Sequence, residues 1–147
     1  MRRLLIIGCG DVALRALAQL RARYRIYGLT RNREHAALLR MHGVLPIVGD
    51  LDDPASLAGL TGIAQDVLHC APPPAHGARD TRTAHLIAAL AKAKSLPQHV
   101  VYISTSGVYG DCAGELIAET RPLRPQTARA QRRVDAERQL RRWGRRS

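Results

Sequence analysis

Five short apolar runs alternate with longer segments of helical pattern along the chain. The runs, which are rich in leucine and β-branched residues, occupy residues 3–7, 25–29, 44–48, 66–70 and 100–104. The helical patterns that follow them occupy residues 11–23, 33–42, 54–61, 79–94 and 127–143. Strict alternation of strand and helix favours a parallel sheet, because parallel neighbours need a crossover that a helix supplies. The sequence therefore predicts an α/β fold.

Residues typical of helix ends stand at several of these boundaries. Asp53 and Pro54 have the types preferred at the N-cap and first helical position, just at the start of the third helical pattern. Gly43 follows the second pattern and Gly144 follows the last, as expected of glycine beyond a helix C-terminus. These local signals agree with the periodicity.

Length and composition predict one domain covering residues 1–147. A chain of 147 residues that is 46% hydrophobic is long enough to bury a real core. It has no run of 18 apolar residues for a membrane span, and the first apolar run is too short for a signal peptide. We therefore expect a cytoplasmic protein without a membrane partner. Cys9, Cys70 and Cys112 have no metal-ligand or disulfide spacing, so we expect reduced thiols and no metal site.

The formal net charge of +11 is concentrated at the C-terminal end. Residues 1–120 contribute +3, whereas residues 121–147 hold ten arginines against two acids and contribute +8. A basic segment binds nucleic acid mainly when it is focused on one surface together with residues that read bases. Aromatic residues are only 3% of the chain and no RNA- or DNA-reading motif is present, which favours a solvated helix face over a nucleic-acid partner.

A glycine-rich turn joins the first apolar run to the first helical pattern. Its sequence, GCGDVA at residues 8–13, fits G-x-G-x-x-G/A. The first glycine permits the tight turn, the second lets backbone N–H groups approach a pyrophosphate, and the small Ala13 lets helix and strand pack closely. The helix N-terminus then faces the phosphates. The candidate cofactor-binding residues of this turn are Gly8, Cys9, Gly10, Asp11 and Val12.

Two ligand classes use such a turn, and GCG also resembles the first motif of S-adenosylmethionine methyltransferases. Those enzymes usually carry acids two residues before the first glycine and at the end of the second strand, where this chain has Ile6 and Thr30. NAD-binding domains also carry an acid at the end of the second strand, where it accepts a hydrogen bond from the ribose 2′-hydroxyl. Thr30, Arg31 and Asn32 instead offer a guanidinium and neutral groups to a 2′-phosphate, with no competing carboxylate expected. NADP is therefore favoured, with NAD left open.

The predicted sheet order is 3-2-1-4-5, a doubly wound, Rossmann-like arrangement with helices on both faces. In such sheets the ligand binds at the carboxyl ends of the strands where the order reverses. This order places the first apolar run beside the fourth and leaves the fifth at an edge. An apolar edge strand favours association, so self-association is open.

Three segments resemble the extended short-chain dehydrogenase/reductase superfamily, the NAD-dependent epimerase/dehydratase group. They are VGDLDDPASL (48–57), DVLHCAPPP (66–74) and, most specifically, VVYISTSGVYGD (100–111). The resemblance covers essentially the whole chain. It implies that Asp50 and Leu51 flank the adenine and that Ala71 and Pro72 line the cofactor trough. The glycine turn matches the shorter spacing of atypical members rather than the usual G-x-x-G-x-x-G.

The resemblance also implies catalytic positions after the fifth run. Thr105 stands where a Ser or Thr hydrogen-bonds the reacting oxygen, and Tyr109 stands among substrate-facing residues. The family's Y-x-x-x-K pair is replaced by Arg129 and Arg133. Arginine stays protonated in proteins, so Arg129 cannot exchange the proton near neutral pH. Tyr109 is then the nearby phenol left as an acid–base candidate.

Family members continue beyond the point corresponding to Ser147 into a C-terminal substrate-binding part. We therefore expect only the N-terminal, cofactor-binding part here, acting on an unidentified small-molecule substrate. Three functions remain open. The first is the NADP-preferring domain of an epimerase/dehydratase-like oxidoreductase, the second a non-catalytic NADPH-binding or sensor module. The third, a nucleic-acid-associated protein, has the least support.

Overall fold

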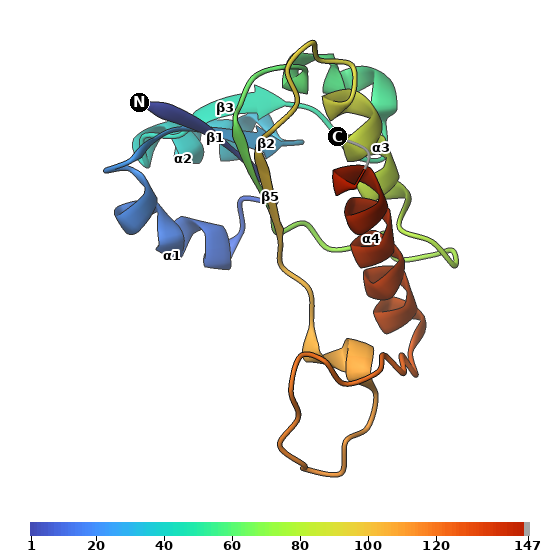
Figure 1. The fold of residues 1–147 in the computed structure, drawn as a ribbon. Coiled ribbons are helices and arrows are strands. Elements are labelled where there is room, and N and C mark those ends of the chain that lie inside the picture. The colour runs from blue at the N-terminus through green and yellow to red at the C-terminus, as the bar shows by residue number, and fades with distance from the viewer. Residues whose placement is uncertain (146–147) are drawn as a thin grey trace. The chain divides into compact units, whose positions relative to one another are not determined.

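The computed structural model describes residues 1–145 (Figure 1). The chain forms two compact units. The first comprises residues 1–72 and 85–103, and the second comprises residues 73–84 and the chain from residue 104 onward. The single domain expected from the length stays a prediction.

The first unit is built on a five-stranded sheet in which every neighbouring pair is parallel. Its strands are β1 (Arg2–Ile7), β2 (Tyr24–Thr30), β3 (Leu45–Val48), β4 (Asp66–His69) and β5 (His99–Tyr102). Their order is β3-β2-β1-β4-β5, which confirms the predicted topology. The first strand pairs with the fourth as expected, with Leu4 opposite Asp66 and Ile7 opposite His69. The carboxyl ends of all five strands therefore lie at one edge of the sheet.

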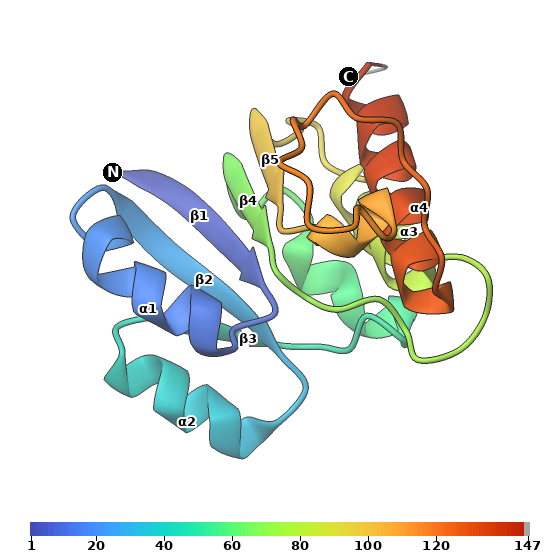
Figure 2. The same cartoon turned by 90° about the horizontal axis from the view of Figure 1, so that it is seen from below.

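The central strand β1 is buried on both faces. Leu4 and Ile6 belong to a cluster with Ala13 and Leu17 of α1 (Asp11–Leu20). Leu5 and Ile7 point to the opposite face, because side chains alternate along a strand, and both are fully buried. Helices consequently cover both faces: α1 and α2 (Arg33–Met41) lie on one, and η1 (Pro54–Leu60) lies on the other (Figure 2). This is a Rossmann-like α/β fold, as predicted.

The third predicted helix forms as the 3-10 helix η1 rather than as an α-helix. Asp53 caps it as expected, its carboxylate accepting from Ala55 N at 3.2 Å. The Ser56 hydroxyl donates to the carbonyl of Asp53 at 2.7 Å. Such a bond from a side chain back to the preceding turn, within a segment of only seven residues, favours the tighter helix.

Two other helix boundaries differ from the prediction. α3 (Thr81–Leu90) begins after Asp80, whose carboxylate accepts from both Thr83 N and Thr83 Oγ1 at 3.0 and 2.9 Å. A side chain that satisfies the first free N–H groups in this way marks the N-cap. α4 (Ala128–Gly144) includes Gly144, which was expected just beyond it. Gly43 does follow α2, with φ of +72°.

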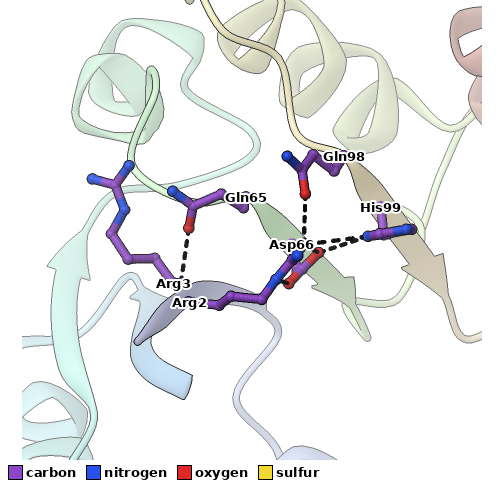
Figure 3. A network of polar contacts seen from close by, with 6 residues as sticks. All are labelled: Arg2, Arg3, Gln65, Asp66, Gln98 and His99. Atoms are coloured by element: carbon purple, nitrogen blue, oxygen red, sulfur yellow. Dashed lines mark hydrogen bonds and ion pairs between the residues drawn. The ribbon is translucent and has the colours of Figure 1, made fainter. Parts of the chain in front are cut away.

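A polar network joins three strands at the amino-terminal edge of the sheet (Figure 3). Arg2 donates to both carboxylate oxygens of Asp66, at 2.8 and 2.7 Å, and to Gln98 at 2.8 Å. His99 Nδ1 lies 2.9 Å from the same carboxylate. Arg2 holds the pKa of Asp66 below its usual range, despite the opposing effect of burial. The network ties β1, β4 and β5 together at the edge away from their carboxyl ends.

The second unit contains η2 (Ser106–Tyr109) and α4, and α4 makes several of the polar contacts in this unit. Asp135 of α4 accepts from the backbone N–H of Asp80 at 2.9 Å and from Gln139 at 2.7 Å. Arg132 donates to the carbonyl of Gly77 at 2.8 Å. These contacts fix the chain that precedes α3 against α4 within this unit.

β5 is an edge strand, as predicted, and Val101 is 55% exposed on it. Among the described residues, no helix is both long and apolar enough to cross a membrane.

Candidate cofactor site

The turn after β1 requires glycine at position 8 for two independent reasons. Gly8 has φ of +87°, in the left-handed region that residues with a Cβ rarely adopt. A Cβ built on it would lie 2.5 Å from Ala71 N and 2.7 Å from Ala71 Cα, a distance that real contacts do not reach. The first glycine therefore brings the end of β1 directly against the chain leaving β4.

Gly10 answers a different requirement. It is the N-cap of α1, its φ of −86° suits any residue, and no side chain caps the helix there. A Cβ on Gly10 would meet no described atom within 4 Å. The space above Gly10 and the free N–H groups of the first turn of α1 fit an anionic group such as a pyrophosphate.

The other residues of the turn divide between the core and the surface. Cys9 is buried and its thiol donates to Ile6 O at 3.7 Å. Burial, with a smaller effect from nearby Cys70, raises the pKa of Cys9 to about 12, so it packs as a protonated thiol. Asp11 is exposed and paired with Arg15 at 2.9 Å, and Val12 is an exposed apolar side chain. The side chains of Asp11 and Val12 are thus accessible to a ligand beside Gly10, whereas Cys9 can offer a ligand only its backbone.

At the end of β2, Thr30 and Asn32, two of the three expected cofactor contacts, form hydrogen bonds within the protein. The Thr30 hydroxyl is buried and lies 3.2 Å from His35 Nδ1 and 3.3 Å from the carbonyl of Asn32. Asn32 is the N-cap of α2, its side-chain oxygen accepting from Glu34 N at 2.7 Å. Their main effect is to hold the connection between β2 and α2, and Arg31 between them extends into solvent.

The expectation that no carboxylate competes for Arg31 is wrong. Arg31 Nη1 lies 4.0 Å from Asp50 Oδ2. The two residues are far apart in sequence but adjacent in space, because β2 and β3 are neighbours and the N–H of Gly49 donates to Thr30 O at 2.9 Å, continuing their pairing. The parallel pairing of the strands therefore carries both charges to the same edge.

Asp50 and Leu51 are held firmly after β3. Asp50 N donates to Ser56 Oγ at 2.8 Å, and Asp50 Oδ1 accepts from Asp52 N at 2.9 Å. The His85 ring lies 2.6 Å from the carbonyl of Leu51, which can only accept, so Nδ1 carries the proton in this contact. The loop that the family resemblance assigns to the adenine is thus anchored from both η1 and α3.

Ala71 and Pro72 follow β4. Ala71 is buried against Gly8, while Pro72 is exposed. The four connections after β1, β2, β3 and β4 all lie at the carboxyl edge, and the Gly8–Ala71 contact marks the place where the strand order reverses. That is the position where ligands bind in open α/β sheets.

The catalytic candidates all belong to the second unit. Thr105 is the N-cap of η2, its hydroxyl accepting from Gly107 N at 3.3 Å. The Tyr109 hydroxyl donates to the carbonyl of Glu119 at 3.2 Å. Arg129 is exposed in the first turn of α4, whereas Arg133, one turn later, is buried.

Three residues that position this site were not found from the sequence. His35 supports Thr30, Ser56 supports Asp50, and His85 supports Leu51. His35 and Ser56 lie five and six residues from their partners, near the start of a predicted helix. A contact between a helix start and the preceding strand end was therefore only weakly indicated by the sequence. His85 is 34 residues from Leu51, a separation that no local pattern bridges.

A family model described as NAD(P)H-binding matches residues 8–144. The chain belongs to this NAD(P)H-binding family. The match covers the glycine turn, the connections after β2, β3 and β4, and all of α4. No curated protein matches the chain.

Solved structures share the fold of this NAD(P)H-binding chain. A putative epimerase from Burkholderia cenocepacia matches with a TM-score of 0.82 and 21% identity, over 97% of this chain and 50% of its own. A short-chain dehydrogenase/reductase superfamily protein from Agrobacterium tumefaciens, with bound NAD, matches with a TM-score of 0.72 and 21% identity, over 95% of this chain and 44% of its own. An NADPH-dependent quinone oxidoreductase from Escherichia coli, complexed with NADPH, gives 0.68 and 21%, over 96% and 45%.

The NAD(P)H-binding chain thus spans about half the length of these three proteins. The family match confirms the expected NAD(P)-binding domain, and the solved structures that share its fold include a putative epimerase and a short-chain dehydrogenase/reductase superfamily protein. These matches show a dinucleotide-binding domain without distinguishing NAD from NADP. Among the described residues, no cluster of His, Cys, Asp and Glu has the makings of a metal site.

Proposed function

We propose that this domain binds NADPH in preference to NADH and supplies the cofactor-binding part of an epimerase/dehydratase-like oxidoreductase. The bound nicotinamide would supply hydride chemistry. The domain's own residues would hold the dinucleotide across the carboxyl edge of the sheet: the glycine turn at the pyrophosphate, the connection after β2 at the adenosine ribose, and the connection after β3 at the adenine.

The preference for NADPH is supported by the exposed position of Arg31. Its side chain is 68% exposed at the end of β2, with the backbone anchored on either side by Thr30 and Asn32. A guanidinium there can bind a phosphate through charge-assisted hydrogen bonds, whereas a free 2′-hydroxyl gains little from it. The acid that would accept from the 2′-hydroxyl of NADH is replaced by a buried threonine.

The proposed preference is tested by titrating the purified chain with NADPH and NADH by isothermal calorimetry at low and high salt. We expect tighter binding of NADPH and a difference between the cofactors that narrows with salt, since the arginine is exposed. S-Adenosylmethionine serves as the control ligand for the other class that uses a GxG turn. Equal affinity for NADPH and NADH at low salt would refute the preference, and binding of S-adenosylmethionine alone would refute the ligand class.

A second candidate function, a non-catalytic NADPH-binding or sensor module, is supported by Arg129 and Arg133. Both replace the acid–base pair of the family, and Arg129 cannot exchange a proton near neutral pH. Thr105 and Tyr109 would then have no role in turnover. The two functions differ in reactivity and not in binding. They are separated by following the absorbance of reduced nicotinamide while NADPH is mixed with the protein and quinone or sugar-nucleotide substrates.

A further inference from the structure

Asp50, in the connection after β3, lies beside Arg31 at the carboxyl edge of the sheet. Asp50 is restrained on three sides: its N–H is bound to Ser56 Oγ at 2.8 Å, its carbonyl accepts from Asp53 N at 3.0 Å, and Oδ1 accepts from Asp52 N at 2.9 Å. Only Oδ2 is turned toward Arg31, 4.0 Å from Nη1. The carboxylate is therefore a restrained negative charge beside an exposed positive one.

The geometry of this pair leaves the guanidinium available. At 4.0 Å the two atoms are too far apart for a hydrogen bond, and the Arg31 side chain is 68% exposed against 36% for Asp50. Exposed pairs of this kind contribute little stability. A phosphate that hydrogen-bonds Arg31 directly would displace the carboxylate, because it is more highly charged and forms shorter contacts.

We propose that Asp50 limits the preference for NADPH by competing with the 2′-phosphate for Arg31. A 2′-phosphate must draw the guanidinium from the carboxylate, whereas NADH leaves the ion pair in place. Asp50 would thus be a specificity-determining residue, and its effect would reach NADPH through Arg31 alone. This inference rests on the proposed preference for NADPH, which Arg31 provides.

The decisive experiment compares Asp50→Asn and Arg31→Gln, singly and together, by calorimetric titration with NADPH and NADH. Asparagine has the size of aspartate and keeps a side-chain oxygen for the N–H of Asp52. Since any change at the adenine affects both cofactors alike, the quantity compared is the ratio of NADPH affinity to NADH affinity. We expect Asp50→Asn to raise this ratio by about two- to five-fold, the range of an exposed ion pair. In the Arg31→Gln background the same substitution should leave the ratio unchanged, because the guanidinium for which the carboxylate and the phosphate compete is absent.

Asp53→Asn is the matched control. It removes the same charge three residues away, has no ion pair with Arg31, and keeps the N-cap of η1 because asparagine is as good a cap. An equal gain in NADPH affinity from Asp53→Asn would show a general charge effect and overturn the inference. A gain from Asp50→Asn that persists without Arg31 would overturn it too, since repulsion of the phosphate would then suffice.

Failure of the inference is distinguishable from failure of the proposed function. If Arg31→Gln abolishes the NADPH preference but Asp50→Asn leaves the ratio of the two affinities unchanged, the proposed function stands and the competition is refuted. If wild-type protein shows no preference for NADPH, both are refuted.

Discussion

The backbone of Gly8 lies so close to that of Ala71 that a Cβ on Gly8 would stand 2.5 Å from the Ala71 nitrogen. This contact joins the turn after β1 to the chain leaving β4, at the reversal of strand order. The same turn contains Gly10, where a Cβ would meet no described atom within 4 Å. One glycine therefore serves the fold, and the other leaves space for a ligand.

Gly8→Ala should destabilise the domain itself. The left-handed backbone and the overlap with the backbone of Ala71 each add a cost, and the free energy of unfolding should fall by about 2 kcal/mol or more. Chemical denaturation without cofactor measures it. An unchanged denaturation midpoint would contradict the close approach of the two segments.

Gly10→Val should leave the domain folded and abolish dinucleotide binding. Its backbone angles suit a residue with a Cβ, and the branched side chain would fill the space assigned to the pyrophosphate. The pair of measurements is a thermal melt of the free protein and calorimetric titration with NADPH. Wild-type NADPH affinity in the folded variant would place the cofactor elsewhere.

Arg31→Ala should weaken NADPH and spare NADH. A charge-assisted contact is worth about 1.5–3 kcal/mol, which corresponds to roughly 10- to 100-fold in the dissociation constant. Titration of each cofactor at low salt gives the ratio. A similar loss of affinity for both would show that Arg31 has a general structural role.

His85→Ala should weaken the binding of NADPH and NADH alike, unlike Arg31→Ala. His85 holds the carbonyl of Leu51 at 2.6 Å, in the loop assigned to the adenine that NADPH and NADH share. Loss of one such hydrogen bond costs about 1 kcal/mol, or roughly five-fold in affinity. A change confined to NADPH, measured in the same titrations, would contradict this positioning role.

Asp66 should make the stability of the domain depend on acid pH. Its pKa is lowered in the folded state by Arg2, so the ionised carboxylate stabilises the fold above the pKa of the unfolded chain, near 3.8. That contribution is lost as the pH falls through the lower, folded-state pKa. Asp66→Asn should be less stable than wild type at pH 7, and the gap should shrink on acidification (Figure 3). Denaturation curves at pH 7, 5 and about 3 follow the difference, and a gap independent of pH would argue against the ion pair.

The order of elements and the location of the candidate site were predictable from local patterns. Continuous apolar runs, the glycines at positions 8 and 10, and the cap at Asp53 each encode their own backbone conformation, so the sheet order and the carboxyl-edge site followed from general rules for parallel sheets. The helix type of η1 was missed, because the hydroxyl of Ser56 bonds to backbone carbonyls in a way that periodicity does not report.

By itself the sequence determined which segments become strands, where the glycine turn lies, and that an arginine rather than an acid follows β2. Only the tertiary structure decided which side chains meet at the carboxyl edge. Thr30 is turned inward to His35, His85 supports Leu51, and Asp50 stands beside Arg31. The physical reason is that capping preferences and hydrophobic periodicity are encoded in a few neighbouring residues, whereas ion pairs and hydrogen bonds between side chains of different elements depend on how those elements pack. The pairing of β2 with β3 is what carries Asp50 to within 4.0 Å of Arg31.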